Sequence, residues 1–342
     1  MPRVLVVATS RKTRGGITAV IKAHETGEQW KRFNCHWVQT HRDGSILIKL
    51  FYLLNGYLDF LLHIWSSDIV HFHVSLQNTI RRKLPLLKFA KLLGKKSIIH
   101  LHCGSQIDFI WNKNFDYMFS ECDRILVLSE SIKKKIASKI NDTKRINVLY
   151  NPCPQVFLPE IQDKRPFILF SGTLYKGKGY QDLIHAFAEI AYKYPMWKVV
   201  FAGNGEIDEG KNLSRKLGIE QQIEFAGWVS GTEKESLFRN ASIFCLPSYA
   251  EGFPMAVLDA WAYGLPVVTT PVGGIPDVAI DGENMLLFNP GDISQLSNNL
   301  ERLILDTNLR TKISTASKTF AESIFNINTI NHQLSDIYSS VL

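Results

Sequence analysis

Short apolar runs alternate with amphipathic stretches along the first half of the chain. The runs are rich in Val and Ile and have the length of strands that are buried on both faces of a sheet. Six of them occur in this half, at residues 4–9, 35–39, 69–74, 97–102, 124–129 and 146–150. The stretches between them mostly have the pattern of helices, so the alternation predicts a parallel, doubly wound α/β sheet.

The second half repeats this pattern. Six further runs occur at residues 167–172, 198–203, 223–227, 243–246, 266–270 and 285–288. Between the halves, prolines recur from Pro152 to Pro166, which is typical of an interdomain linker. We therefore expect an N-terminal domain at residues 1–153, a second domain at residues 154–320 and a C-terminal helical segment at residues 321–342.

Residues 45–65 depart from the alternation because they are almost continuously apolar. Polar residues such as Lys49, Asp59 and His63 interrupt the segment, which makes it a poor membrane span. These polar residues fall near one helical face and leave a broad apolar remainder. We expect that remainder to be buried against the sheet. The alternative is docking into a bilayer surface, which the basic run 81–96 could border.

Composition describes a globular protein with an uneven charge. Of 342 residues, 45% are apolar, and the five cysteines are scattered without a CxxC pair, which suggests reduced thiols in the cytoplasm. The first ten residues lack the apolar core of a signal peptide. Residues 1–150 hold 24 Lys and Arg against 11 Asp and Glu, a net charge of +13. The remaining residues carry a net charge of −6, and the whole chain carries +7. This asymmetry indicates an anionic partner such as a phosphate-bearing lipid, a membrane surface or nucleic acid, unless it is only a solvated surface.

Candidate chemistry is concentrated in residues 247–270, which have the pattern of a loop, a helix and a strand. Two acids, Glu251 and Asp259, lie eight residues apart. Eight helical residues rise about 12 Å, too far to flank one scissile bond. The acids could contact opposite ends of an elongated ligand, with the helix N-terminal N–H groups of Met255 and Ala256 seating a phosphate between them. A buried βαβ unit with solvated acids is the alternative.

A glycine-rich loop, residues 172–179, follows the first strand of the second half. It carries Lys176 and Lys178, so its backbone N–H groups and ammonium charges could hold a diphosphate. It is not a Walker loop, because no Gly-Lys-Ser/Thr sequence occurs.

Two features of the first half could also contact a ligand. Gly15-Gly16 follows the first strand, where paired glycines permit either a close backbone approach or a simple turn. His102 ends the fourth strand. His100 shares its face of the strand and is the rival for the same role.

The sequence resembles the large family of retaining, GT-B-fold nucleotide-sugar glycosyltransferases known as family four, over most of residues 1–335. Glu251 and Asp259 resemble its Glu-x7-Glu signature, in which the first acid contacts the donor sugar and the second the nucleotide ribose. The loop at 172–179 resembles its Gly-Arg-Leu-x3-Lys-Gly pattern. Lys178 stands at the diphosphate-binding Lys, while Thr173 replaces the Arg.

The resemblance implies two Rossmann-like domains facing a cleft, with the C-terminal segment folded back across the first domain. It implies catalytic roles for His102 and Glu251. It implies a donor-binding set of Gly15, Gly16, Thr173, Lys176, Lys178, Gly203, Trp228, Phe253, Met255, Ala256 and Asp259.

The expected function is retaining transfer of a sugar from a nucleoside-diphosphate sugar to a glycan or polyprenyl-phosphate-linked acceptor in surface polysaccharide biosynthesis. No Asp-x-Asp cluster occurs, so no essential metal is expected, and no cofactor beyond the donor substrate. We expect a cytoplasmic protein that could be peripheral on the inner face of the membrane. A nucleotide-sugar epimerase or a phosphorylase of the same fold remains an alternative. So does a polyanion-binding protein, which would bind with steep salt dependence and ignore nucleotide sugars.

Overall fold

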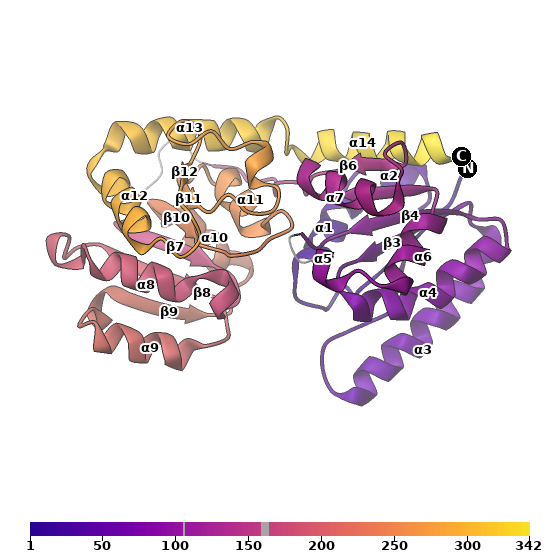
Figure 1. Ribbon diagram of the computed structural model, residues 1–342, viewed down its shortest axis with the longest axis horizontal. Helices are drawn as coiled ribbons and strands as arrows, with labels where there is room; N and C mark the ends of the chain where they lie inside the picture. Colours follow the sequence, from indigo (N-terminus) through magenta and orange to yellow (C-terminus); the bar gives the residue numbers. More distant parts are fainter. Residues whose placement is uncertain (105–106, 159–163) are drawn as a thin grey trace. The chain divides into compact units, whose positions relative to one another are not determined.

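The chain forms two compact units in the computed structural model, which describes residues 1–104, 107–158 and 164–342 (Figure 1). Unit 1 comprises Met1–Pro152 and Ile327–Leu342, and unit 2 comprises Cys153–Asn326. The linker predicted around Pro152–Pro166 lies partly outside the described residues.

Unit 1 is built on a six-stranded parallel sheet with the order β2-β1-β3-β4-β5-β6. The strands are β1 (Val4–Ala8), β2 (His36–Gln39), β3 (Ile69–Val74), β4 (Lys96–Leu101), β5 (Arg124–Val127) and β6 (Ile146–Val148). Each of these strands lies within one of the six predicted runs, except that β4 begins one residue before its run. Because every strand runs in the same direction, all the carboxyl ends meet at one edge, where ligands of such sheets bind.

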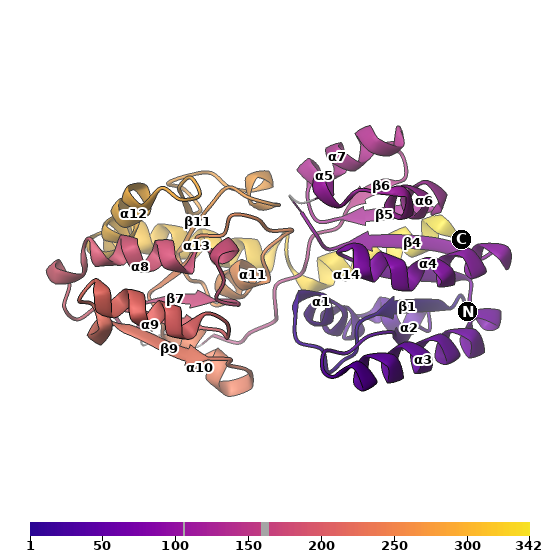
Figure 2. The ribbon, with the colours of Figure 1, turned by 60° about the horizontal axis from the view of Figure 1, so that its bottom comes forward.

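Helices cover both faces of this sheet (Figures 1 and 2). The helices of unit 1 are α1 (Gly16–Glu25), α2 (Glu28–Arg32), α3 (Ile46–His63), α4 (Gln77–Leu92), α5 (Ile107–Ile110), α6 (Lys113–Glu121), α7 (Glu130–Ile140) and α14 (Ile327–Val341). Helices α1, α2 and α14 lie over one face, and α4 and α6 lie over the other.

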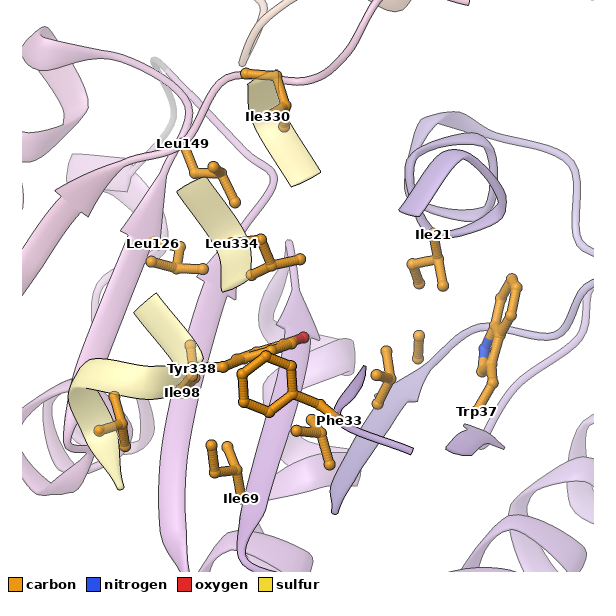
Figure 3. Close-up of a cluster of buried hydrophobic side chains, with 14 residues drawn as sticks. Ile21, Phe33, Trp37, Ile69, Ile98, Leu126, Leu149, Ile330, Leu334 and Tyr338 are labelled. Atoms are coloured by element: carbon orange, nitrogen blue, oxygen red, sulfur yellow. The ribbon is translucent and has the colours of Figure 1, made fainter. Parts of the chain in front are cut away.

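The C-terminal helix α14 supplies part of the core of unit 1. Its side chains Ile330, Leu334 and Tyr338 pack with Ile69 of β3 and Ile98 of β4 in one buried cluster (Figure 3). Tyr338 also contacts the ring of Phe33 edge-on at 5.2 Å between centroids. The last residues of the chain thus complete a domain that its first residues begin.

Unit 2 has a second parallel six-stranded sheet with the order β12-β11-β10-β7-β8-β9. Its strands are β7 (Phe167–Ser171), β8 (Lys198–Ala202), β9 (Ile223–Gly227), β10 (Ile243–Leu246), β11 (Val267–Thr269) and β12 (Leu286–Leu287). Its helices are α8 (Tyr180–Ala188), α9 (Ile207–Lys216), α10 (Gly231–Asn240), α11 (Met255–Ala262), α12 (Ile293–Leu305) and α13 (Thr307–Glu322). The strand order reverses between β7 and β10, so the loops after these two strands border the crevice in which doubly wound sheets bind ligands.

The expectation that residues 45–65 are buried against the sheet is wrong. Within α3 only Gly56 and Phe60 are buried, while most of its large apolar side chains are exposed. The helix instead presents its polar side to the protein, where Asp59 pairs with His36 at 2.8 Å. By length and composition, the segment Ile46–Ser66 could cross a membrane. Only 11% of its most apolar 18-residue stretch is buried in the protein.

Candidate active site

The loops after β7 and β10 are in direct contact at the carboxyl edge of the unit 2 sheet. Gly179 has a φ of +66°, and a Cβ at this position would lie 2.0 Å from the carbonyl oxygen of Pro247. The N–H of Tyr249 donates a hydrogen bond to the carbonyl of Gly177 at 3.0 Å. The glycines of the 172–179 loop therefore permit a close approach to the second loop, which a side chain would prevent.

The loops after β8 and β11 join the same assembly. A Cβ at Gly203 would lie 1.8 Å from the carbonyl oxygen of Gly172, so β8 ends directly against the glycine-rich loop. On the other side, the N–H of Gly274 donates to the carbonyl of Gly252 at 2.7 Å. Four neighbouring strands thus deliver their loops to one continuous surface.

Lys178 and Glu251, two charged residues of this surface that the sequence singled out, are in contact. The Nζ atom of Lys178 lies 2.5 Å from Oε1 of Glu251, and the hydroxyl of Ser248 donates to the same oxygen at 2.7 Å. Both side chains of the ion pair are mostly buried. An ammonium group has three N–H donors, and the pair with Glu251 uses one of them. A cation suited to a diphosphate therefore lies beside a carboxylate suited to sugar hydroxyls.

Helix α11 starts beside this ion pair and has an uncovered N-terminus. Pro254 occupies the N-cap position without a side-chain hydrogen bond to the first turn. The N–H groups of Val257 and Leu258 donate to the Pro254 carbonyl, whereas in the described part of the chain Met255 and Ala256 have no such acceptor. Free N–H groups and the helix dipole are what an anion binds at a helix N-terminus, and the phosphate seat at Met255 and Ala256 stays a prediction.

Asp259 lies within α11 and is paired with a lysine that the sequence analysis did not identify. The Nζ atom of Lys234, on α10, lies 2.7 Å from Oδ2 of Asp259. Burial raises the pKa of Asp259, and the charge and hydrogen bond of Lys234 oppose that rise. Lys234 thus holds the carboxylate in place, and only 9% of the surface of Asp259 is exposed.

The remaining predicted donor contacts differ in exposure. Thr173 and Lys176 are exposed in the glycine-rich loop, and Trp228 is exposed after β9. The side chain of Phe253 is buried, with its ring centroid 5.0 Å from that of Phe325 and 6.0 Å from that of Trp261. The side chain of Phe253 is therefore not available to a ligand.

In unit 1, the structure distinguishes the two rival histidines. His100 lies within β4 and is buried, and neither of its ring nitrogens has a hydrogen-bond partner in the part of the protein described. His102 follows the strand end and is partly exposed, with its Nε2 atom 2.8 Å from Nδ1 of His73. Burial, and to a lesser extent Lys83, lower the pKa of His102 to about 3. His102 is therefore the one that can meet a ligand, as a neutral imidazole.

These two histidines belong to a larger stack that sequence reasoning missed. His71 and His73 alternate on β3 and share a face with His100 and His102 on β4, since His73 pairs with His100 across the strands. Neighbouring rings lie 4.2–5.5 Å apart between centroids. The signal was available in two His-x-His sequences, because alternate residues of a strand share one face.

Three histidines of the stack are close enough together to bind one metal ion, but their rings are not oriented to do so. Ligand atoms of His71, His73 and His100 lie within 4.8 Å of one another, and a second such group is formed by His36, Asp59 and His63. In the buried group, the planes of His71 and His100 are only 8° apart. The lone pairs of ring nitrogens lie in the plane of the ring, so those of two stacked, parallel rings lie in separate planes and do not converge on one ion. We therefore assign the stack to packing.

Gly15 and Gly16 lie at the start of α1. Gly15 is the N-cap residue, with a φ of +142°, and no heavy atom of the described residues lies within 4 Å of where a Cβ would be. The helix therefore begins with an open, uncapped N-terminus at the carboxyl edge of the unit 1 sheet.

Comparison with known proteins extends this description. Residues 156–320 match the family model described as glycosyl transferases group 1. An uncharacterized glycosyltransferase of Haemophilus influenzae is 32% identical over 207 residues, which cover 59% of this chain and 57% of that protein. The lipopolysaccharide 1,6-galactosyltransferase of Salmonella typhimurium is 31% identical over 224 residues, which cover 63% of this chain and 62% of that protein. The matched part thus spans less than two thirds of either relative's own length.

Solved structures resemble the whole chain. Anabaena Alr3699/HepE in complex with UDP-glucose matches with a TM-score of 0.81 at 18% identity, over 99% of each chain. The apo form of the lipopolysaccharide outer core galactosyltransferase WaaB matches with a TM-score of 0.72 at 22% identity, over 99% of this chain and all of that one. These likenesses confirm the predicted GT-B fold.

Proposed function

We propose that the protein transfers a hexosyl group from a nucleoside-diphosphate sugar with retention of configuration. The match of residues 156–320 to the glycosyl transferases group 1 model supports this proposal. The observation that carries this proposal is the contact between Lys178 and Glu251 beside the N-terminus of α11. A sugar diphosphate needs cationic and N–H donors at one end and hydrogen-bond acceptors at the other. This surface offers both within one ion pair.

Each group has a defined task in the proposed reaction. Negative charge develops on the departing diphosphate as its bond to the sugar breaks, and Lys178 with the N–H groups of Met255 and Ala256 stabilises that charge. Glu251 orients the sugar by accepting hydrogen bonds from its hydroxyls. Asp259, held by Lys234, accepts from the ribose. The acceptor hydroxyl attacks from the face that the nucleotide leaves, which retains the configuration.

The relatives support a narrower choice of substrates. Alr3699/HepE is solved with UDP and with UDP-glucose, which supports a UDP-hexose as the donor. A lipopolysaccharide galactosyltransferase and the capsular polysaccharide glycosyltransferase CapM of Staphylococcus aureus are among the relatives, which supports a surface glycan precursor as the acceptor. An acceptor carried on polyprenyl phosphate, or another glycan precursor held at the cytoplasmic leaflet, is the form we propose, because the +13 charge of residues 1–150 suits a peripheral protein at an anionic surface.

Thermal-shift measurements against UDP-, GDP-, ADP- and CMP-hexoses test the donor. A ligand present at 100 times its dissociation constant stabilises the folded state by about 2.7 kcal/mol, so the correct donor should raise the unfolding temperature visibly. We expect the largest shift with a UDP-hexose. Absence of a shift with every nucleotide sugar would contradict the proposal, and so would conversion of the donor sugar to its epimer without any acceptor.

The Lys178→Ala variant is expected to bind UDP about 10- to 150-fold more weakly. One charge-assisted hydrogen bond is worth roughly 1.5–3 kcal/mol, and the Lys176→Ala, Lys178→Ala double variant should lose more because Lys176 is exposed on the same loop. Isothermal titration calorimetry measures the change. Lys193→Ala is the matched control, since Lys193 pairs with Glu301 elsewhere in unit 2. Unchanged affinity in the double variant would remove this loop from the diphosphate site.

A further inference from the structure

Helix α3 and the turn that follows it carry a continuous apolar face on the outside of unit 1. We define this apolar face by eight side chains that are each 42–76% exposed: Leu47, Leu50, Phe51, Leu54, Leu58, Leu61, Leu62 and Trp65. At 100° per residue they fall in a sector about 120° wide, and none of the charged residues of the helix lies in it. Soluble proteins rarely expose a contiguous apolar surface of this extent without a partner.

The opposite side of α3 is anchored to the unit and is the more polar one. Gly56 allows the helix backbone to approach β2 so closely that a Cβ would lie 2.5 Å from the carbonyl oxygen of Gln39. Asp59 accepts from His36 at 2.8 Å, and the hydroxyl of Tyr57 donates to the carbonyl of Arg82 at 2.6 Å. These contacts fix the rotation of the helix about its own axis, so the apolar face points away from the sheet.

Helix α4 lies beside α3 (Figure 1). Its basic residues border the apolar face. The ring of Phe89 on α4 lies 6.2 Å from that of Trp65, and Leu92 is 80% exposed. Helix α4 contains five Lys and Arg and no acid, and its Arg81 and Lys88 are exposed. Lys83, which the sequence suggested for this border, is instead buried and donates to the carbonyl of His73.

We infer that α3 docks onto an anionic lipid bilayer, lying in the plane of the interface with its apolar face among the upper acyl chains. Leu, Phe and Trp on one side with Lys and Arg at the border are the composition of interfacial helices. Arg81 and Lys88 then lie at the level of the lipid phosphates, where their positive charge attracts the anionic headgroups. This inference deepens the proposed membrane-side acceptor by naming the element and the residues that hold the bilayer.

Two other occupants of the apolar face fit the structure less well. The 18 residues of α3 extend about 27 Å and could span a bilayer, but spanning would separate Asp59 from His36 and carry its carboxylate into hydrocarbon. A second copy of the chain would bring together two units that are each strongly basic. An anionic surface complements that charge instead.

Vesicle flotation tests the inference with the full chain. The unaltered protein should float with vesicles of phosphatidylglycerol and phosphatidylethanolamine and much less with pure phosphatidylcholine. The Leu54→Gln, Leu58→Gln double variant should partition at least about tenfold less, since it removes two apolar side chains from the surface that enters the acyl chains. Met196→Gln with Leu305→Gln is the matched control, because these side chains are 75% and 66% exposed in unit 2. It should float like the unaltered protein.

Other outcomes would overturn the inference. Normal flotation of the Leu54→Gln, Leu58→Gln variant would exclude α3 as the docking element. If the bound protein resists extraction with alkaline carbonate, α3 spans the bilayer. If the unaltered protein is a dimer, the same variant is a monomer and neither binds vesicles, the apolar face is a self-association surface. The thermal shift with UDP-hexose should be equal in all these variants. If the unaltered protein shows no thermal shift with any UDP-hexose, the proposed transfer is refuted, while the flotation result remains valid.

Discussion

The Glu251→Gln variant is expected to lose sugar transfer by at least about 100-fold while it binds free UDP as tightly as the unaltered protein, or more tightly. Removing one preorganised electrostatic contact from a reacting centre costs about 10²–10³ in rate. The gain in UDP affinity follows from the contact between Glu251 and Lys178, because the carboxylate competes with a diphosphate for the same ammonium group. The amide keeps the shape of the side chain and removes its charge.

Transfer kinetics and calorimetry with UDP separate the two effects. The Glu301→Gln variant is the matched control, since Glu301 also pairs with a lysine of unit 2 at 3.1 Å but lies away from the loops of the site. It should have unchanged kcat and unchanged UDP affinity. Normal turnover of Glu251→Gln would remove Glu251 from the reaction. Weaker UDP binding would instead mean that Glu251 holds Lys178 in position.

Most of the fold follows from local patterns in the sequence. The twelve predicted runs coincide with the twelve strands of the two sheets, because a strand buried on both faces must be apolar along its whole length. The predicted ends extend one or two residues too far in several cases. Residues 4–9 are apolar or β-branched throughout, yet β1 ends at Ala8. Side-chain type does not reveal where the pairing of backbones stops.

The contacts of the site could not be predicted, because they depend on the order of strands. Lys178 and Glu251 are 73 residues apart and meet because β10 pairs with β7, while β8 and β9 lie on the far side of β7. Local patterns identified both residues as candidates but not their contact. Lys234 was missed because its helix, α10, has no distinctive motif, and only its contact with Asp259 connects it to the site.

The orientation of α3 shows a different limit. Periodicity identifies that the helix has a polar and an apolar side, and burial of the apolar side is the usual outcome in water. Here the polar side faces the protein because Asp59 pairs with His36 and Gly56 packs against the backbone of β2. Both partners lie more than 15 residues away in the sequence. A pattern along one helix cannot contain that information.

Unit 1 is expected to lose stability steeply as the pH falls from 6.5 to 5.5. Burial lowers the pKa of His71, His73 and His100 well below its usual range, with the neighbouring histidines as further causes. Below the ordinary pKa of about 6.5 the unfolded chain therefore binds protons that the folded chain does not, and stability falls as the pH decreases. Each histidine contributes up to about 1.4 kcal/mol per pH unit. The unfolded imidazole is half protonated at pH 6.5 and almost fully protonated at pH 5.5, so three together could remove about 3 kcal/mol over this range. This is a large part of the roughly 5–15 kcal/mol that stabilises a domain.

Hydrogen exchange in β3 and β4 between pH 7 and pH 5, corrected for the intrinsic pH dependence of exchange, measures this loss within unit 1, and β7 and β8 of unit 2 serve as the internal reference. The His100→Leu variant should recover about 1 kcal/mol of the fall between pH 6.5 and pH 5.5, because it removes one group that the unfolded chain protonates over this range. His332→Leu is the matched control, since the side chain of His332 on α14 is 79% exposed, and it should behave like the unaltered protein. Equal pH dependence in His100→Leu and the unaltered protein would mean that the stack does not control the acid stability of unit 1. Carboxylates of unit 1 would then be the groups to examine, because their protonation is the common alternative cause of acid unfolding.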